Sequence, residues 1–89
     1  MPERITWTKA AWEDYLNWQM QDRKTFRRIN LLLQDSVRTP FSGIGKPEQL
    51  RENLSGFWPR RIDVANRLVY TVDENDLVIM HVVTITNET

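Results

Sequence analysis

The sequence predicts an α+β domain in which two N-terminal helices pack on a twisted antiparallel β-sheet. Three observations predict this class: a short alternating segment at the N-terminus, two following segments with apolar residues at helical spacing, and three strand-like segments after them. The chain has 89 residues, the length of one domain, and contains no internal repeat or linker-like segment. We therefore assign residues 1–89 to a single domain.

Alternation and capping residues mark the first strand and both helices. Residues 4–7 alternate polar and apolar side chains, which is typical of a short strand. Thr8 and Asp22 each precede an amphipathic segment and are predicted N-caps. Thr39-Pro40 ends the second helix, because the residue before proline avoids helical backbone angles. The predicted apolar stripes are Trp12, Tyr15 and Leu16, with Ala11 and Trp18 beside them, and then Phe26, Ile29, Leu33 and Val37.

The second half of the chain is predicted to form an antiparallel meander. Residues 40–47 form the loop before it. This loop holds two of the three glycines and two of the four prolines, which indicates a defined backbone conformation. A short element is expected around residues 49–54. The predicted strands are 57–63, 66–72 and 76–83, joined by turns at 64–65 and 73–75.

Composition excludes several classes of function. The chain has no cysteine and one histidine, so it has no disulfide, thiol nucleophile or multi-histidine metal site, and we expect no metal or other cofactor. No apolar run approaches the roughly 20 residues that cross a bilayer, and the N-terminus lacks a signal-peptide core. We therefore expect a cytoplasmic protein without a membrane partner. Nine of its twelve cationic residues are arginines, which suit either an anion-binding surface or plain solvation.

Strand parity predicts a pair of arginines on one face of the sheet. Arg61 and Arg67 lie on either side of the turn near Val64, with the same orientation. Two neighbouring guanidinium groups repel unless an anion joins them, and Glu48 or a phosphate could be that anion. The functional interpretation is a phosphodiester site, with a carboxylate as general base and arginines around the developing charge. The alternative is a solvated sheet face with ordinary ion pairs.

Two further features have a functional and a structural interpretation each. The basic run at residues 23–28 either contacts RNA phosphates or is the solvated face of a helix. His81 on the last strand is either a catalyst or an ordinary buried or edge histidine.

Five segments of the chain resemble the YoeB toxins, a branch of the RelE/ParE-like superfamily of bacterial toxins. The resemblance runs from about residue 5 to residue 80, with one change in the last segment, where Asn66 replaces the family's histidine. The segments are Trp12–Leu16, Thr39–Glu48, Asn53–Trp58, Arg60–Ile62 and Asn66–Tyr70.

The resemblance implies a microbial RNase fold and the toxin of a YefM–YoeB type II toxin–antitoxin system. Its implied activity is ribosome-dependent cleavage of mRNA in the aminoacyl site. Attack by the 2′-hydroxyl leaves a 2′,3′-cyclic phosphate, and no metal is needed. The implied partners are a YefM-like antitoxin, the ribosome and its mRNA, operator DNA only through the antitoxin, and a second copy of the chain in a homodimer.

The family's site residues carry over by motif. Glu48 resembles the general base, Arg67 the main phosphate-stabilising cation and Arg61 its partner on the neighbouring strand. Lys46 and Arg51 resemble cations that contact RNA around the site.

The C-terminus departs from the family. Its members usually end in Arg-Tyr-His-Tyr, whose histidine is the implied general acid, but the aligned residues here are 83–86, with Ile85 at the histidine position. His81 shares the parity of Ile85, but it lies roughly 13 Å upstream in a strand, too far to replace it without a bulge or register shift. Water, a ribosomal group and Tyr70 are other candidates for the general acid. The alternative function is a catalytically weakened or inactive YoeB-like protein that acts as an antitoxin-binding module and co-repressor.

Overall fold

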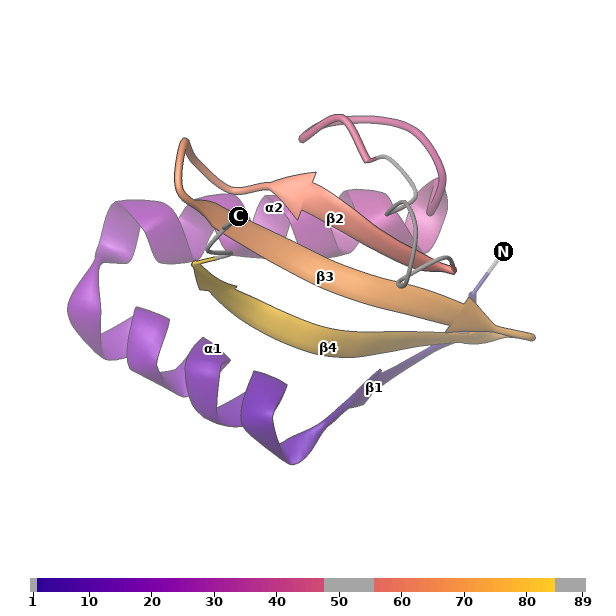
Figure 1. Ribbon diagram of the computed structural model, residues 1–89, viewed down its shortest axis with the longest axis horizontal. Coiled ribbons are helices and arrows are strands. Elements are labelled where there is room, and N and C mark those ends of the chain that lie inside the picture. The colour runs from indigo at the N-terminus through magenta and orange to yellow at the C-terminus, as the bar shows by residue number, and fades with distance from the viewer. Residues whose placement is uncertain (1, 48–55, 85–89) are drawn as a thin grey trace.

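The computed structural model describes residues 2–47 and 56–84, which form two helices and a four-stranded sheet (Figure 1). The order of elements is the predicted one. The element expected around residues 49–54 lies outside the described residues. The elements are β1 (Arg4–Trp7), α1 (Lys9–Gln21), α2 (Arg23–Arg38), β2 (Phe57–Arg61), β3 (Asn66–Asp73) and β4 (Asp76–Thr84).

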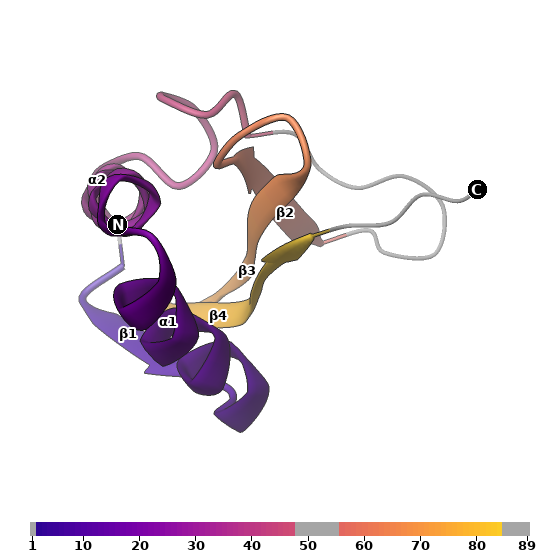
Figure 2. The same cartoon turned by 90° about the vertical axis from the view of Figure 1, so that its left-hand side faces the viewer.

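The sheet has the strand order β1-β4-β3-β2. The last three strands form the predicted antiparallel meander, whereas β1 pairs parallel to β4, so the sheet as a whole is mixed. Parallel pairing needs a long crossover, and the chain between β1 and β4 supplies one through both helices. The two helices lie on the same side of the curved sheet (Figure 2), and neither of them covers its other face, here called the open face.

The helices begin at the predicted caps. The Thr8 hydroxyl accepts a hydrogen bond from the Ala11 amide at 3.0 Å, and an Asp22 carboxylate oxygen accepts from the amides of Lys24 and Thr25. In α2 the predicted stripe is correct, with Ile29 and Leu33 in the core. These local signals therefore fix both helix starts.

The buried face of α1 differs from the predicted stripe. Ala11 is fully buried, whereas Trp12 and Leu16 keep 45% and 39% of their surface exposed. The helix packs against β4 through Trp18, whose indole Nε1 donates to the Val82 carbonyl at 2.6 Å. Trp12 instead stacks edge-on against Trp7 at the edge of the sheet. The small side chain of Ala11 permits the close approach that a tryptophan would block.

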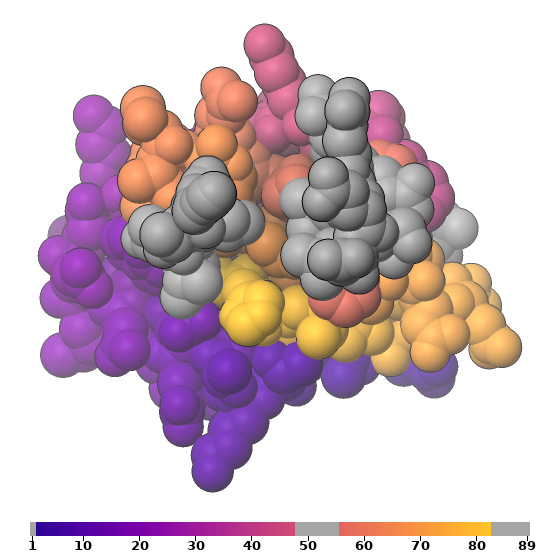
Figure 3. All heavy atoms as spheres, in the orientation of Figure 1, coloured from indigo at the N-terminus to yellow at the C-terminus, as the bar shows by residue number. Residues whose placement is uncertain are grey.

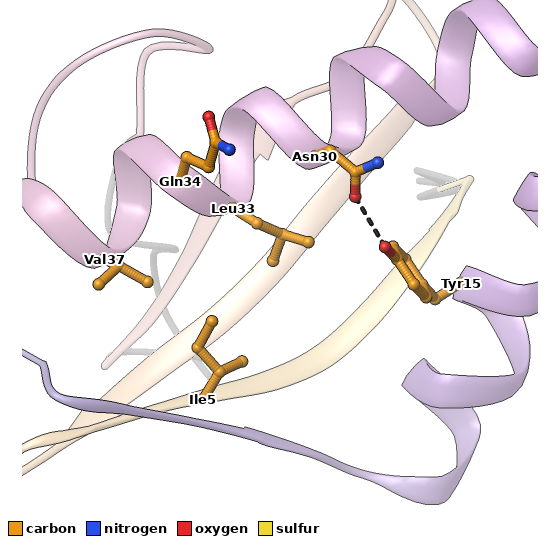
Figure 4. Close-up of a pocket in the computed structure, with 6 residues that line it drawn as sticks. All are labelled: Ile5, Tyr15, Asn30, Leu33, Gln34 and Val37. Carbon is orange, nitrogen blue, oxygen red and sulfur yellow. Dashed lines mark hydrogen bonds between the residues drawn. The ribbon is translucent and has the colours of Figure 1, made fainter.

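A groove of about 580 Å³ lies between the two helices and β1 (Figure 4). Tyr15 closes one end of it by donating a hydrogen bond to the Asn30 side chain at 2.7 Å, which ties α1 to α2. The other lining residues are Ile5, Leu33, Gln34 and Val37. The groove is thus on the helical side, away from the open sheet face.

The pairing of β4 with β3 shifts by one residue in its middle. Val69 lies opposite His81 and Tyr70 lies opposite Ile79, so Met80 has no partner across the ladder. Because of this extra residue, Ile79 and Val82 both face the core, whereas His81 is exposed. Strict alternation would have placed His81 on the same face as Ile79.

Candidate active site

Arg61 and Arg67 are direct partners across the β2–β3 ladder, as strand parity predicts. Strand alternation sets both on the face away from the buried Arg60 and Leu68, which is the open face. Figure 3 shows the molecule with residues of β4, in yellow, at its surface. The two arginines line a hollow of about 190 Å³, together with Gly45, Lys46 and Pro59. Three cationic side chains from two strands and a loop therefore converge on one hollow.

The β2–β3 turn positions Arg67. Nη1 of Arg67 donates to the carbonyls of Asp63 at 2.7 Å and Asn66 at 3.0 Å. The Asp63 carboxylate in turn accepts from the backbone amides of Ala65 and Asn66. Burial acts to raise the pKa of Asp63, but the hydrogen bonds from Asn66 and Ala65 and the charge of Arg67 bring it below its usual value. The turn is therefore held by an ionised carboxylate at neutral pH.

Arg61 is held through its backbone. Its carbonyl accepts from Nη2 of Arg28 at 3.0 Å, and its amide donates to the Gly45 carbonyl at 2.8 Å. Within residues 2–47 and 56–84 no side chain accepts a hydrogen bond from the Arg61 guanidinium. In that part of the chain, its charge beside Arg67 is not neutralised by a carboxylate.

Arg60, the neighbour of Arg61, points into the core and is fully buried. Its Nε donates to the Tyr70 hydroxyl at 2.9 Å and its Nη1 donates to Asp35 at 2.6 Å. The three remaining N–H groups donate to backbone carbonyls of the loop after α2. These carbonyls belong to Thr39, Ser42 and Ile44.

The sequence analysis assigned no role to Arg60, which shares a strand face with Trp58 and Ile62. A charged residue among apolar neighbours was the available signal, because a buried guanidinium needs a partner. The hydrogen bond from Arg60 is the largest cause that lowers the pKa of Asp35 below its usual value, while partial burial opposes it. Asp35 also accepts from the Ile44 amide at 3.0 Å.

Two glycines permit the loop to lie against this network. Gly43 has a φ of 112° and a Cβ there would collide with the Asp35 carboxylate. Gly45 has a φ of 79°, and a Cβ would lie 2.9 Å from the Leu32 side chain and 3.2 Å from the Arg61 amide nitrogen. Both positions combine a left-handed backbone with a close approach, so only glycine fits without strain.

The structure brings together only part of the predicted site. Lys46, Arg61 and Arg67 share one hollow, whereas Glu48 and Arg51 lie outside the described residues. His81 is exposed opposite Val69, on the open face.

Tyr70 does not lie where it could donate a proton to the leaving oxygen, so this suggestion is wrong. Tyr70 is fully buried, and its hydroxyl donates to the Pro40 carbonyl while it accepts from Arg60. Its side chain lies on the core side of β3 with that of Leu68, on the face opposite Arg67. It therefore cannot reach a phosphate held by the arginine pair.

The described residues contain no group of three or more histidine, aspartate and glutamate side chains with the arrangement of a metal site. None of the helices in that part of the chain is both long and apolar enough to span a membrane. The feature that stands out chemically is the cationic hollow, since guanidinium groups bind phosphate oxygens in paired hydrogen bonds.

Sequence comparison finds one family over most of the chain. Residues 7–84 match the sequence model of the "YoeB-like toxin of bacterial type II toxin-antitoxin system". Toxin YoeB of Streptomyces coelicolor is 53% identical over 77 residues, which cover 86% of this chain and 92% of that protein.

Solved structures of similar proteins have the same fold. The YoeB/ParE toxin from Agrobacterium tumefaciens has a TM-score of 0.89 at 36% identity and covers 93% of this chain and 99% of its own. The YoeB–YefM complex from Staphylococcus aureus has a TM-score of 0.85 at 42% identity, covering 93% and 97%. A YoeB dimer from the same organism has a TM-score of 0.85 at 43% identity, with the same coverage.

Proposed function

The chain belongs to the YoeB-like toxin family of bacterial type II toxin–antitoxin systems, and we propose that it is a metal-independent endoribonuclease that cleaves mRNA on the ribosome. The observation that carries the proposal is the register pairing of Arg61 with Arg67 beside Lys46. Three cations around a hollow of about 190 Å³ suit one phosphate group and the charge that develops on it.

The proposed reaction is an internal transesterification. Glu48 removes the proton of the 2′-hydroxyl, and the resulting oxygen attacks the adjacent phosphorus. Arg67 and Arg61 stabilise the extra negative charge on the phosphorane, while Lys46 and Arg51 contact the RNA around it. The bond from phosphorus to the 5′ oxygen then breaks. The products are a 2′,3′-cyclic phosphate and a free 5′-hydroxyl, after the leaving oxygen has taken up a proton.

We propose His81 as the donor of that proton. The support is the unpaired Met80, which turns the His81 side chain to the open face and sets it opposite Val69. Val69 lies two residues from Arg67 on β3, so His81 is a diagonal neighbour of Arg67, and Arg61 lies one strand further on β2. A histidine side chain is the most common general acid in proton transfer by enzymes.

The proposed partners follow the solved relatives. The Staphylococcus aureus toxin is described in a complex with YefM and as a dimer. By analogy, this chain pairs with a YefM-like antitoxin, reaches operator DNA only through it, and forms a homodimer.

A second candidate function is favoured by Ile85, which stands where the family's histidine is expected. In this case the chain is a catalytically weakened or inactive toxin that binds its antitoxin and acts as co-repressor. General acid catalysis is typically worth about 10²–10⁴-fold, so a chain without a working acid would lose most of its activity.

The deciding experiment adds purified protein to translating ribosomes and maps mRNA 5′ ends. The endonuclease proposal expects cleavage in the aminoacyl site that disappears in Glu48→Gln. A folded protein that binds ribosomes or antitoxin but cuts nothing would favour the binding module instead.

A second substrate tests His81 separately. With a 5′-thio leaving group, which departs without protonation, His81→Gln should cut as fast as the parent protein, whereas it should be slow on ordinary RNA. Equal rates on ordinary RNA would remove His81 from the mechanism and leave water or a ribosomal group.

A further inference from the structure

We propose that Arg60 and Asp35 are positioning residues, which hold Lys46 beside the arginine pair so that the phosphate subsite is assembled before RNA binds. This inference rests on the proposed function, because it takes the hollow of Lys46, Arg61 and Arg67 as the site of the phosphate. The new point is which residues of the core hold the phosphate subsite in place.

One buried side chain anchors the loop that carries Lys46. Arg60 uses all five of its N–H groups, and three of them bind carbonyls of Thr39, Ser42 and Ile44 within six residues of the chain. Asp35 binds the same loop from α2 through the Ile44 amide. The hydrogen bonds within the loop are longer, at 3.3 Å from the Lys46 amide to the Gly43 carbonyl, 3.4 Å from the Ser42 amide to the Thr39 carbonyl and 3.1 Å from the Thr39 hydroxyl to the Ser42 carbonyl. The loop is therefore shaped mainly by the Arg60–Asp35 pair.

The anchored segment leads directly into the site. Ile44 is held by Arg60 and Asp35, and the next carbonyl, that of Gly45, accepts from the Arg61 amide at 2.8 Å. Lys46 follows with a φ of 49°, a left-handed conformation that is uncommon for a residue with a side chain. Such a conformation persists only where the surroundings hold it.

Electrostatics explains why the loop has to be held. Lys46, Arg61 and Arg67 carry like charges around one small hollow, so a free loop would move its ammonium group away from the two guanidinium groups. Cations fixed beforehand around the developing charge need no rearrangement during the reaction. The Arg60–Asp35 pair lies on the core side of the sheet and supplies that restraint without touching the substrate.

Stability alone gives no reason for a buried ion pair at this place, because apolar residues of similar volume are often as stabilising. This fact also provides the test. The double variant Arg60→Met with Asp35→Leu removes both charges together and leaves no unpaired charge in the core. The matched control is Arg38→Met, which removes the exposed partner of the same Asp35 carboxylate.

The probe is inorganic phosphate, titrated against uniformly ¹⁵N-labelled protein. In the parent protein we expect shifts centred on Lys46, Arg61 and Arg67. In the double variant we expect cooperative unfolding to persist, phosphate affinity to fall by at least about tenfold, and hydrogen exchange of the Arg61 amide to accelerate. The control variant should match the parent protein in all three measurements.

Each outcome bears on a different claim. A folded double variant with the parent's phosphate affinity and Arg61 protection would overturn the positioning role and leave the proposed function intact. A parent protein that binds phosphate at this hollow but cuts no mRNA would contradict only the proposed function. If the parent protein binds no phosphate there, the subsite and the inference both fail.

A milder variant covers the case in which the double variant does not fold. Tyr70→Phe keeps the ion pair but removes the hydroxyl that accepts from Arg60 and donates to Pro40. It should weaken phosphate binding by a smaller factor and speed exchange of the Arg61 amide. Unchanged binding and exchange in a folded Tyr70→Phe protein would count against the proposal.

Discussion

Arg60 and Arg61 are neighbours on β2, but their guanidinium groups lie in opposite environments. Arg60 is fully buried and donates five hydrogen bonds, one of them to the carboxylate of Asp35. Arg61 is exposed and faces Arg67, with no carboxylate partner in the part of the chain that the structure describes. All the N–H groups of the Arg60 side chain donate hydrogen bonds within the fold, whereas the guanidinium of Arg61 can bind an anion.

The difference shows how strand alternation divides one residue type between two tasks. Successive side chains of a strand point to opposite faces, so adjacent arginines necessarily separate. The two are nonetheless connected, because the loop that Arg60 holds returns to the Arg61 backbone through Gly45. The geometry of the open face thus depends on a charge in the core.

The largest expected effect on stability comes from removal of the buried Arg60 side chain. Arg60→Ala leaves Asp35 partly buried without its buried partner, and we expect the free energy of unfolding to fall by about 3–5 kcal/mol. Arg61→Ala should change the same quantity by less than about 0.5 kcal/mol, because the side chain is exposed. Urea denaturation of both variants measures the contrast. Equal losses would mean that burial does not distinguish the two arginines.

The second prediction concerns the outward side. Removal of either Arg61 or Arg67 should lower the single-turnover rate of mRNA cleavage by about 10²–10³-fold, the usual cost of one donor to a developing negative charge. Arg4→Ala is the matched control, since this exposed arginine lies on β1 at the opposite edge of the sheet. An Arg67→Ala protein as active as the parent would remove the arginine pair from the mechanism.

Local signals predicted the fold well. The α+β class is confirmed, and α1 and α2 begin at the predicted caps Thr8 and Asp22. The family predicted from five short segments is confirmed by the match over residues 7–84. Capping and periodicity involve residues a few positions apart, so one chain suffices to recognise them.

Contacts between distant residues account for what sequence reasoning missed. Asp35 lies 25 positions from Arg60, and three of the other four acceptors are backbone carbonyls, which carry no sequence signal. The parallel pairing of β1 and the extra residue at Met80 likewise depend on the assembled sheet. For the site, parity predicted the pairing of Arg61 with Arg67, but the roles of Glu48 and Arg51 stay predictions.

The third prediction compares alanine substitutions at two glycines and tests how closely the loop approaches Arg60 and Arg61. Gly45→Ala should destabilise the protein by about 2–3 kcal/mol, because strain at a positive φ adds to contacts with Leu32 and the Arg61 amide. Gly56→Ala shares the positive φ, but its Cβ would meet no atom of the described residues within 4 Å, so its cost should be about 1 kcal/mol. Thermal unfolding of both variants gives the difference. If the two losses are the same, the approach of the loop to Arg60 and Arg61 is not tight.

The smallest expected effect is the pH dependence of stability that Asp35 contributes on the inward side. The folded protein holds the pKa of Asp35 below its usual value, chiefly through the hydrogen bond from Arg60. The unfolded chain therefore binds a proton more readily, and the stabilisation is present above about pH 4 and is lost as the pH falls through the folded pKa. Asp22 and Asp63 also have lowered pKa values, so unfolding alone would not isolate Asp35.

The site-specific measurement is the carboxyl ¹³C shift of Asp35, followed from pH 7 downward in the parent protein and in Arg38→Gln. Arg38 also contacts this carboxylate, but its side chain is 75% exposed. Exposed ion pairs contribute little. We therefore expect the variant to titrate almost as low as the parent protein. If the pKa of Asp35 returned to its usual value in Arg38→Gln, the exposed Arg38 and not Arg60 would be the cause of the lowered pKa. The buried Arg60 would then act only as an anchor for the loop carbonyls.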